Sequence, residues 1–143
     1  MDHRNWGLPN NSSPADVDMV IHNRVNDYIL EVELKTDSAS YHYFKNHHYG
    51  QWGLHKAFVN NGNGKQFYAL AKHYMPDDRA IDTINDIQEF SFLVYDNEIG
   101  YKSTPIYPGE IWQASVFKLM GYPMPMDLTI SHNGITFKGD EWI

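Results

Sequence analysis

Hydrophobic and polar residues alternate along YILEVELKT (28–36), a segment near the start of the chain. Successive side chains of a β-strand point to opposite faces, so this segment predicts a strand with one buried and one charged face. The buried face would hold Leu30, Val32 and Leu34, and the charged face Glu31, Glu33 and Lys35. The preceding segment ADVDMVI (15–21) alternates in the same way. The short connection between the two segments predicts a hairpin.

Further strands are expected where short apolar runs lie between turn residues. Residues 66–74 and 89–96 fit this description. The segment LTISHNGITFKG (128–139) predicts a hairpin, because Asn-Gly at 133–134 favours a two-residue turn.

Two longer segments have the residue spacing of helices. Residues 108–121 predict a helix that ends at Gly121, and residues 47–59 predict another that ends in the turn-forming NNGNGK sequence. The residues that share one face of the earlier helix are Gln51, Leu54, His55 and Phe58. A short helix is also expected within 76–88, with Pro76 in its first turn. Together these elements predict an α/β fold with a mixed central β-sheet flanked by helices and a C-terminal β-hairpin.

Composition narrows the class of protein. The chain has 143 residues and is 42% hydrophobic, which fits a single domain, residues 1–143. Within it we distinguish an irregular lead-in (1–15), a core motif region (14–74) and an acidic half (75–143). The absence of cysteine excludes disulfides, thiolate metal ligands and a cysteine nucleophile. We find no membrane-spanning stretch and no signal-peptide pattern, so we expect no membrane association and a cytoplasmic location, or the inside of a host cell for a viral protein.

The net charge of −7 is unevenly distributed. Residues 1–74 contain 7 Lys and Arg against 7 Asp and Glu, whereas residues 75–143 contain 4 against 11. Phosphate contacts dominate the affinity of proteins for DNA, so an acidic protein is a poor general DNA binder. The neutral first half could still bind DNA, especially with metal ions.

The charged side of the predicted hairpin suggests a metal site. Asp18 on the first strand can lie beside Glu33 on the second, and two neighbouring carboxylates bind a hard cation such as Mg²⁺. Lys35, on the same face, can orient or help to deprotonate a water at that cation, as phosphodiester hydrolysis requires. The alternative is a solvated strand face, with a Glu33–Lys35 ion pair of little energetic value and Glu31 as a surface residue.

The spacing of these residues resembles a known signature. Asp18, followed fifteen positions later by Glu33-Leu34-Lys35, is similar to the PD-(D/E)xK motif of restriction-endonuclease-like nucleases. A helix carrying Gln51, a glycine-containing turn and a strand then follow, as in Holliday-junction resolvases and stand-alone viral nuclease domains. The resemblance covers residues 14–74. Asp16 also lies in the first segment, so which aspartate matches the motif stays open.

This resemblance implies a restriction-endonuclease-like core and a Mg²⁺-dependent endodeoxyribonuclease, with Mn²⁺ as a substitute. Its partner would be DNA, including branched, Holliday-junction-like DNA, in a recombination process. Asp18 and Glu33 would be metal ligands, and Asp18, Glu33, Lys35 and Gln51 the catalytic residues. Gln51 would orient the water or Lys35; the alternative is an ordinary residue at a helix start.

The chain departs from this family at its start. Family members usually carry a helix with an acidic residue before the aspartate strand, and the prolines within 1–15 disfavour a helix there. That helix could be missing, replaced by 108–121 with Glu110 as its acid, or supplied by a partner chain. We therefore expect a homodimer, which would also suit cutting two strands. The alternative function is a non-catalytic binding module, nuclease-like or aromatic-rich, that recognises protein or carbohydrate. The net charge of −7 and the two glycines within 47–59 favour this alternative.

Histidines are concentrated in the first half of the chain. His48 and His55 are seven residues apart and would share a helical face. Zinc sites more often use pairs four residues apart. We therefore expect both to be surface or DNA-facing residues.

Overall fold

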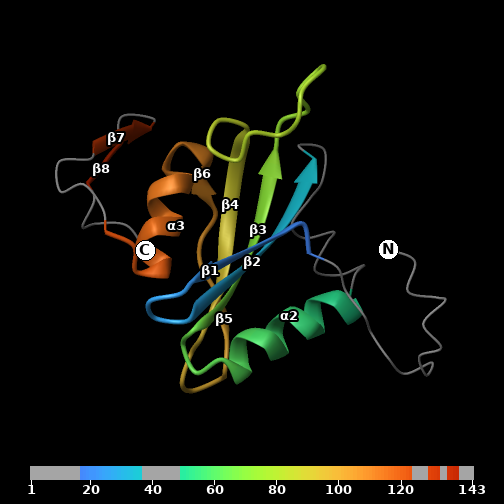
Figure 1. The fold of residues 1–143 in the computed structure, drawn as a ribbon, viewed down its shortest axis with the longest axis vertical. Helices are drawn as coiled ribbons and strands as arrows, with labels where there is room; N and C mark the ends of the chain where they lie inside the picture. Colours follow the sequence, from blue (N-terminus) through green and yellow to red (C-terminus); the bar gives the residue numbers. More distant parts are fainter. Residues whose placement is uncertain (1–16, 37–48, 124–128, 133–134, 139–143) are drawn as a thin grey trace.

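The computed structural model describes residues 17–36, 49–123, 129–132 and 135–138 (Figure 1). The elements in chain order are β1 Met19–Asn23, β2 Tyr28–Thr36, α2 Tyr49–Asn61, β3 Gln66–His73, β4 Ile87–Val94, β5 Lys102–Ser103, β6 Tyr107–Pro108, the 3₁₀ helix η2 Gly109–Ile111, α3 Trp112–Met120, β7 Thr129–His132 and β8 Ile135–Lys138. No described helix is long and apolar enough to cross a membrane.

The central sheet is mixed. Its six strands follow the order β1-β2-β3-β4-β5, with β6 also paired to β4. β1 and β2 are antiparallel, β2 and β3 are parallel, and β3 and β4 are antiparallel. A parallel pair needs a crossover connection, which contains α2 here. The α/β class with a mixed central sheet is therefore confirmed, and β7 and β8 form the predicted C-terminal hairpin.

One face of the sheet, which we call the α3 face, forms the main hydrophobic core. It contains the aliphatic residues of β2 that the alternation predicts to be buried, together with aromatic residues of β4 and α3. Its members include Leu30, Val32, Phe67, Phe90, Phe92, Ile111, Trp112 and Met120. The rings of Phe90 and Trp112 meet edge to face with their centroids 5.1 Å apart, a favoured geometry for aromatic pairs.

The opposite face, which we call the α2 face, has an apolar zone and a charged zone. Val59 of α2 packs with Tyr68 and Leu70 of β3 and Leu93 of β4. In Figure 1, α2 crosses the end of the sheet at which β3 begins. Further along the strands this face carries charged side chains of β2, β3 and β4. The core therefore leaves the charged residues of β2 on the side away from α3.

The end of α3 is bonded to the turn between β1 and β2. Gly121 adopts a φ of 76°, the left-handed conformation that ends the helix where the sequence predicts. The side-chain amides of Asn23 and Asn26 both donate to the carbonyl of Met120, at 2.9 and 3.0 Å. Carbonyls at a helix end need partners from outside the helix. These bonds therefore hold the β1–β2 hairpin against α3.

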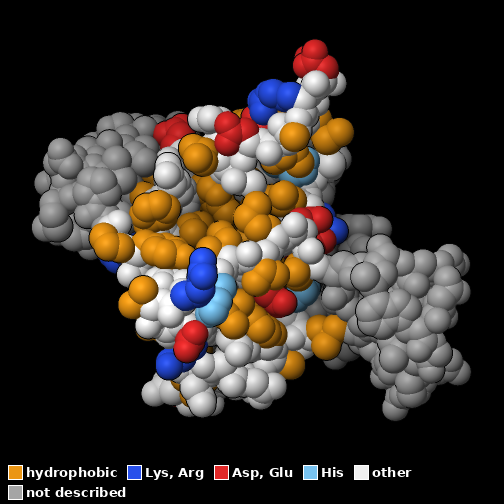
Figure 2. All heavy atoms as spheres, in the orientation of Figure 1, with side chains coloured by type: hydrophobic (Ala, Val, Ile, Leu, Met, Phe, Trp, Pro, Cys, Tyr) orange, Lys and Arg blue, Asp and Glu red, His pale blue; other side chains and the backbone are white. Residues whose placement is uncertain are grey.

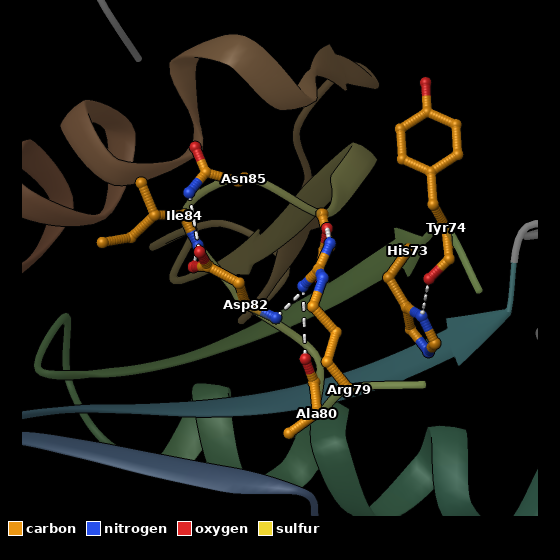
Figure 3. A network of polar contacts seen from close by, with 8 residues as sticks. His73, Tyr74, Arg79, Ala80, Asp82, Ile84 and Asn85 are labelled. Carbon is orange, nitrogen blue, oxygen red and sulfur yellow. Dashed lines mark hydrogen bonds and ion pairs between the residues drawn. The ribbon is translucent and has the colours of Figure 1, made fainter. Parts of the chain in front are cut away.

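The short helix expected within 76–88 does not form, so that prediction is wrong. Arg79 donates two hydrogen bonds of 2.6 Å to Asp86, which also accepts the backbone N–H of Asp82 (Figure 3). The Asp82 carboxylate in turn accepts the backbone N–H of Ile84 at 2.9 Å. Bonds from Asp side chains to nearby backbone groups compete with helical hydrogen bonds. They hold this connection in turns instead.

Candidate active site

The β1–β2 hairpin brings Asp18 next to the Glu33–Leu34 segment of β2. The paired register of the hairpin ends at Met19 and Val32, and Asp18 is a bend residue just before β1. The backbone N–H of Asp18 donates to the carbonyl of Val32 at 3.0 Å. The Oδ2 atom of Asp18 accepts the backbone N–H of Leu34 at 2.7 Å. The carboxylate of Asp18 is thus fixed against the backbone next to Glu33.

Glu33 and Lys35 form an ion pair on the α2 face of β2. Lys35 Nζ lies 3.2 Å from Glu33 Oε1, and the two side chains are 28% and 13% exposed. Partial burial strengthens the attraction between these charges relative to an open surface. The pair is compatible with an ion pair that only stabilises the strand. It is equally compatible with a lysine held beside a metal-binding carboxylate.

Lys72 and Glu89 extend this charged zone onto β3 and β4. Lys72 is the register partner of Lys35, and Glu89 is the register partner of Lys72. Lys72 Nζ lies 3.4 Å from Glu89 Oε1. Neither residue belongs to the Asp18–Glu33–Lys35 motif, so the motif gives no indication of them. A sequence feature that could have pointed to them is one charged residue, Lys72 or Glu89, within each of two largely apolar strands.

Glu31 and His55 meet beneath α2, beside the charged zone. His55 Nδ1 lies 3.9 Å from Glu31 Oε1, and the His55 ring stacks on Tyr68 with the centroids 3.9 Å apart. Burial lowers the pKa of His55 to about 4 and raises the pKa of Glu31, because both charged forms lose hydration. A cavity of about 200 Å³ adjoins the pair and is also lined by Val17, Leu54 and Phe58.

The expectation that His55 is a surface or DNA-facing residue is therefore wrong. His55 is only 3% exposed, because its place on α2 sets it over β2 and β3, whereas the neighbouring Leu54 is 38% exposed. Glu31 is likewise only 23% exposed, instead of being an ordinary surface residue. His48 lies outside the described residues.

The other predicted site residues lie in α2, in η2 or outside the described ranges. Gln51 lies in the first turn of α2. Asp16 and the rest of the lead-in fall outside the described residues, so the identity of the aspartate and the leading helix stay open. Glu110 lies in η2, and the next residue, Ile111, belongs to the core of the α3 face. That places Glu110 on an element of the sheet face away from Glu33.

The acidic residues Asp18 and Glu33 are the candidate metal ligands of this site. Within the described ranges, no group of three or more His, Asp or Glu side chains could hold a metal ion. Mg²⁺ keeps several waters and binds proteins through one or two carboxylates. Asp18 and Glu33 would supply these two carboxylates.

Comparisons with known proteins give no match for this chain, whether to protein-family models, to curated proteins or to solved structures. A fold class alone does not define a function. The function therefore has to be argued from the residues of the site.

Proposed function

We propose that the protein is a Mg²⁺-dependent endonuclease of the PD-(D/E)xK type, which hydrolyses phosphodiester bonds of DNA. The observation that carries the proposal is the attachment of Asp18 to β2 on both sides of Glu33, through Val32 and Leu34, with the Glu33–Lys35 ion pair beside it. The crossover through α2 to a parallel β3 agrees with the order of elements that the resemblance implies. Branched DNA is the substrate to test first.

Each residue of the site has a separate role in this proposal. Asp18 and Glu33 hold the cation, and Mn²⁺ can replace Mg²⁺. The cation acidifies water and offsets the negative charge that develops on the phosphoryl oxygens. Lys35, held 3.2 Å from Glu33, orients the attacking water. Gln51, at the start of α2, assists Lys35 or the water.

A cleavage assay tests the proposal directly. The protein is incubated with supercoiled plasmid, linear duplex and a four-way junction, in Mg²⁺, in Mn²⁺ and in EDTA. We expect metal-dependent cleavage by the wild-type protein and none by Lys35→Ala. Lys102→Ala is the matched control, because it removes an exposed lysine of the edge strand β5 and should cut normally. A folded wild-type protein that cuts none of these DNAs in either metal would contradict the proposal.

A non-catalytic binding module is the second candidate, and exposed apolar side chains favour it. Tyr74, Met75 and Ile84 are 51%, 63% and 55% exposed in the β3–β4 connection. Tyr74 and Ile84 also border a cavity of about 520 Å³ next to Glu110. In Figure 2, charged side chains cover the tip of the protruding connection and hydrophobic side chains gather below it. Such a module would show neither DNA cleavage nor metal-dependent DNA binding.

The proposed assembly is a homodimer, which would present two sites to two strands. Two-fold symmetry is the commonest arrangement of oligomers. Sedimentation at tens of micromolar protein should show a dimer. Full nuclease activity from a species that sediments only as a monomer would contradict this proposal.

A further inference from the structure

Lys35 and Lys72 lie side by side on the α2 face, next to Glu33. They are register partners in the parallel pair of β2 and β3, and neighbouring strands lie about 5 Å apart. Leu34 and Ala71, the residues just before them, pack in the core of the α3 face. Because side chains alternate along a strand, both lysines belong to the opposite, α2 face.

The two lysines form part of a compact group of four charges. Lys35, Lys72 and Glu89 lie in one row across β2, β3 and β4, and Glu33 lies beside Lys35 along β2. Each lysine has a glutamate partner, at 3.2 Å for Lys35 and 3.4 Å for Lys72. The Lys72 side chain is only 16% exposed. Like charges at directly neighbouring positions repel, and partial burial strengthens that repulsion.

We propose that Lys72, beside Lys35, binds a phosphate of the DNA backbone next to the bond that is cut. The inference rests on the proposed nuclease function and specifies how the site holds its substrate. A phosphate oxygen can replace Glu89 as the charged acceptor of the Lys72 ammonium group, and the phosphodiester is the anion that this substrate brings. Lys72 is thus a substrate-binding residue outside the Asp18–Glu33–Lys35 motif.

Glu89 is a positioning residue for Lys72 in this arrangement. It holds the ammonium group over the sheet in the absence of DNA. Its side chain is 35% exposed, more than twice the exposure of Lys72, so water can hydrate its carboxylate once a phosphate takes its place beside the lysine. Glu89 therefore competes with DNA for Lys72. A purely structural ion pair would not compete in this way.

The position of Lys72 also bears on how an acidic chain can bind DNA. The excess of carboxylates lies in residues 75–143, whereas Lys35 and Lys72 both belong to the half without net charge. Phosphate contacts dominate DNA affinity, so binding here depends on Lys72 exchanging Glu89 for a phosphate.

The test is DNA binding by fluorescence anisotropy over a range of salt concentrations. Labelled duplex and four-way junction are used, with Ca²⁺ in place of Mg²⁺ to limit cleavage. Lys72→Gln should weaken binding several-fold, reduce the slope of log affinity against log salt by about one, and raise KM more than it lowers kcat. Lys72→Arg should restore binding, and Glu89→Gln should tighten it. Lys102→Gln, on the exposed strand β5, is the control for loss of a single charge.

The outcomes separate this inference from the proposed function. If the wild-type protein cuts DNA but Lys72→Gln keeps its affinity, salt slope and KM, the ion pair is structural and the inference is wrong, while the nuclease proposal stands. Weaker binding by a folded Glu89→Gln would also overturn the inference. If folded wild-type protein neither binds nor cuts DNA, both proposals fail together.

Discussion

Replacing His55 with phenylalanine should change how the stability of the protein depends on pH. Phenylalanine keeps a ring to stack on Tyr68 but has no group that titrates. Burial lowers the pKa of His55 from 6.5 to about 4, so the unfolded chain takes up a proton first as the pH falls. The stability that comes from a neutral His55 is therefore complete above pH 6.5 and is lost as the pH falls towards 4.

The size of this effect follows from the pKa difference. Each pKa unit corresponds to about 1.4 kcal/mol, so the whole shift corresponds to about 3 kcal/mol. This is an upper limit, because Glu31 lies 3.9 Å away and its carboxylate favours the protonated ring. Urea denaturation should show the free energy of unfolding of the wild-type protein falling by about 2 kcal/mol relative to His55→Phe between pH 7 and 5.

Glu31→Gln gives a control of opposite sign. A raised carboxyl pKa means that the protonated Glu31 contributes stability at low pH, which is lost as the pH rises above its unfolded pKa of 4.5. Removing that group should steepen the rise in stability with pH between 4.5 and 6.5. A difference between wild type and His55→Phe that stays constant from pH 4.5 to 7 would refute a neutral buried imidazole.

Further predictions concern metal binding, backbone packing and the bond that anchors the hairpin. In a thermal-shift assay, Mg²⁺ should raise the melting temperature of the wild-type protein and of Lys35→Ala but not of Glu33→Ala, because Glu33 is a metal ligand and Lys35 is not. Equal stabilisation of all three proteins by Mg²⁺ would contradict the proposed site. Gly109→Ala should strongly lower the free energy of unfolding, because a methyl group there would collide with a backbone carbonyl of β4. Gly53 faces open space, so Gly53→Ala should raise the free energy of unfolding by up to about 1 kcal/mol. The opposite ranking of the two variants in urea denaturation would contradict this packing. Asn23→Ala removes one of the amide donors to the Met120 carbonyl and should lower the free energy of unfolding by about 1–3 kcal/mol in urea denaturation. An unchanged free energy of unfolding would show that this bond does not anchor the hairpin.

The sequence predicts where the longer strands and α3 lie, because each has a local signal. The helix expected from residue 108 nevertheless begins only at Trp112, after β6 and η2. β2 covers the predicted residues 28–36, and its alternation assigns the buried and charged faces correctly. α3 ends at Gly121, whose left-handed conformation suits glycine. β5 and β6 have two residues each, too few to show a period, and they are defined only by pairing with β4. The turns of 76–88 depend on the Arg79–Asp86 contact, which joins residues seven apart.

The candidate site likewise has one part that the sequence predicts and another that it does not. The neighbourhood of Asp18 and Glu33 is predictable, because a hairpin with a short turn fixes its own register. The approach of His55 to Glu31 depends on how α2 docks on the sheet. The approach of Lys72 to Lys35 depends on the register of two parallel strands separated by a crossover. Neither relation leaves a periodic signal in the sequence.

The bonds from the β1–β2 turn to Met120 also bear on the order in which the chain can fold. The strands β1 to β4 are neighbours in chain order, so the sheet forms between successive segments, through a short turn for β1 and β2 and through the α2 crossover for β2 and β3. The contact between Asn23 and Met120 instead joins residues 97 positions apart, and contacts of long range slow folding. On the ribosome, Leu30 and Val32 would emerge long before α3, which covers them. A nascent or truncated chain that lacks α3 should therefore expose an aliphatic sheet face and depend on chaperones to stay unaggregated.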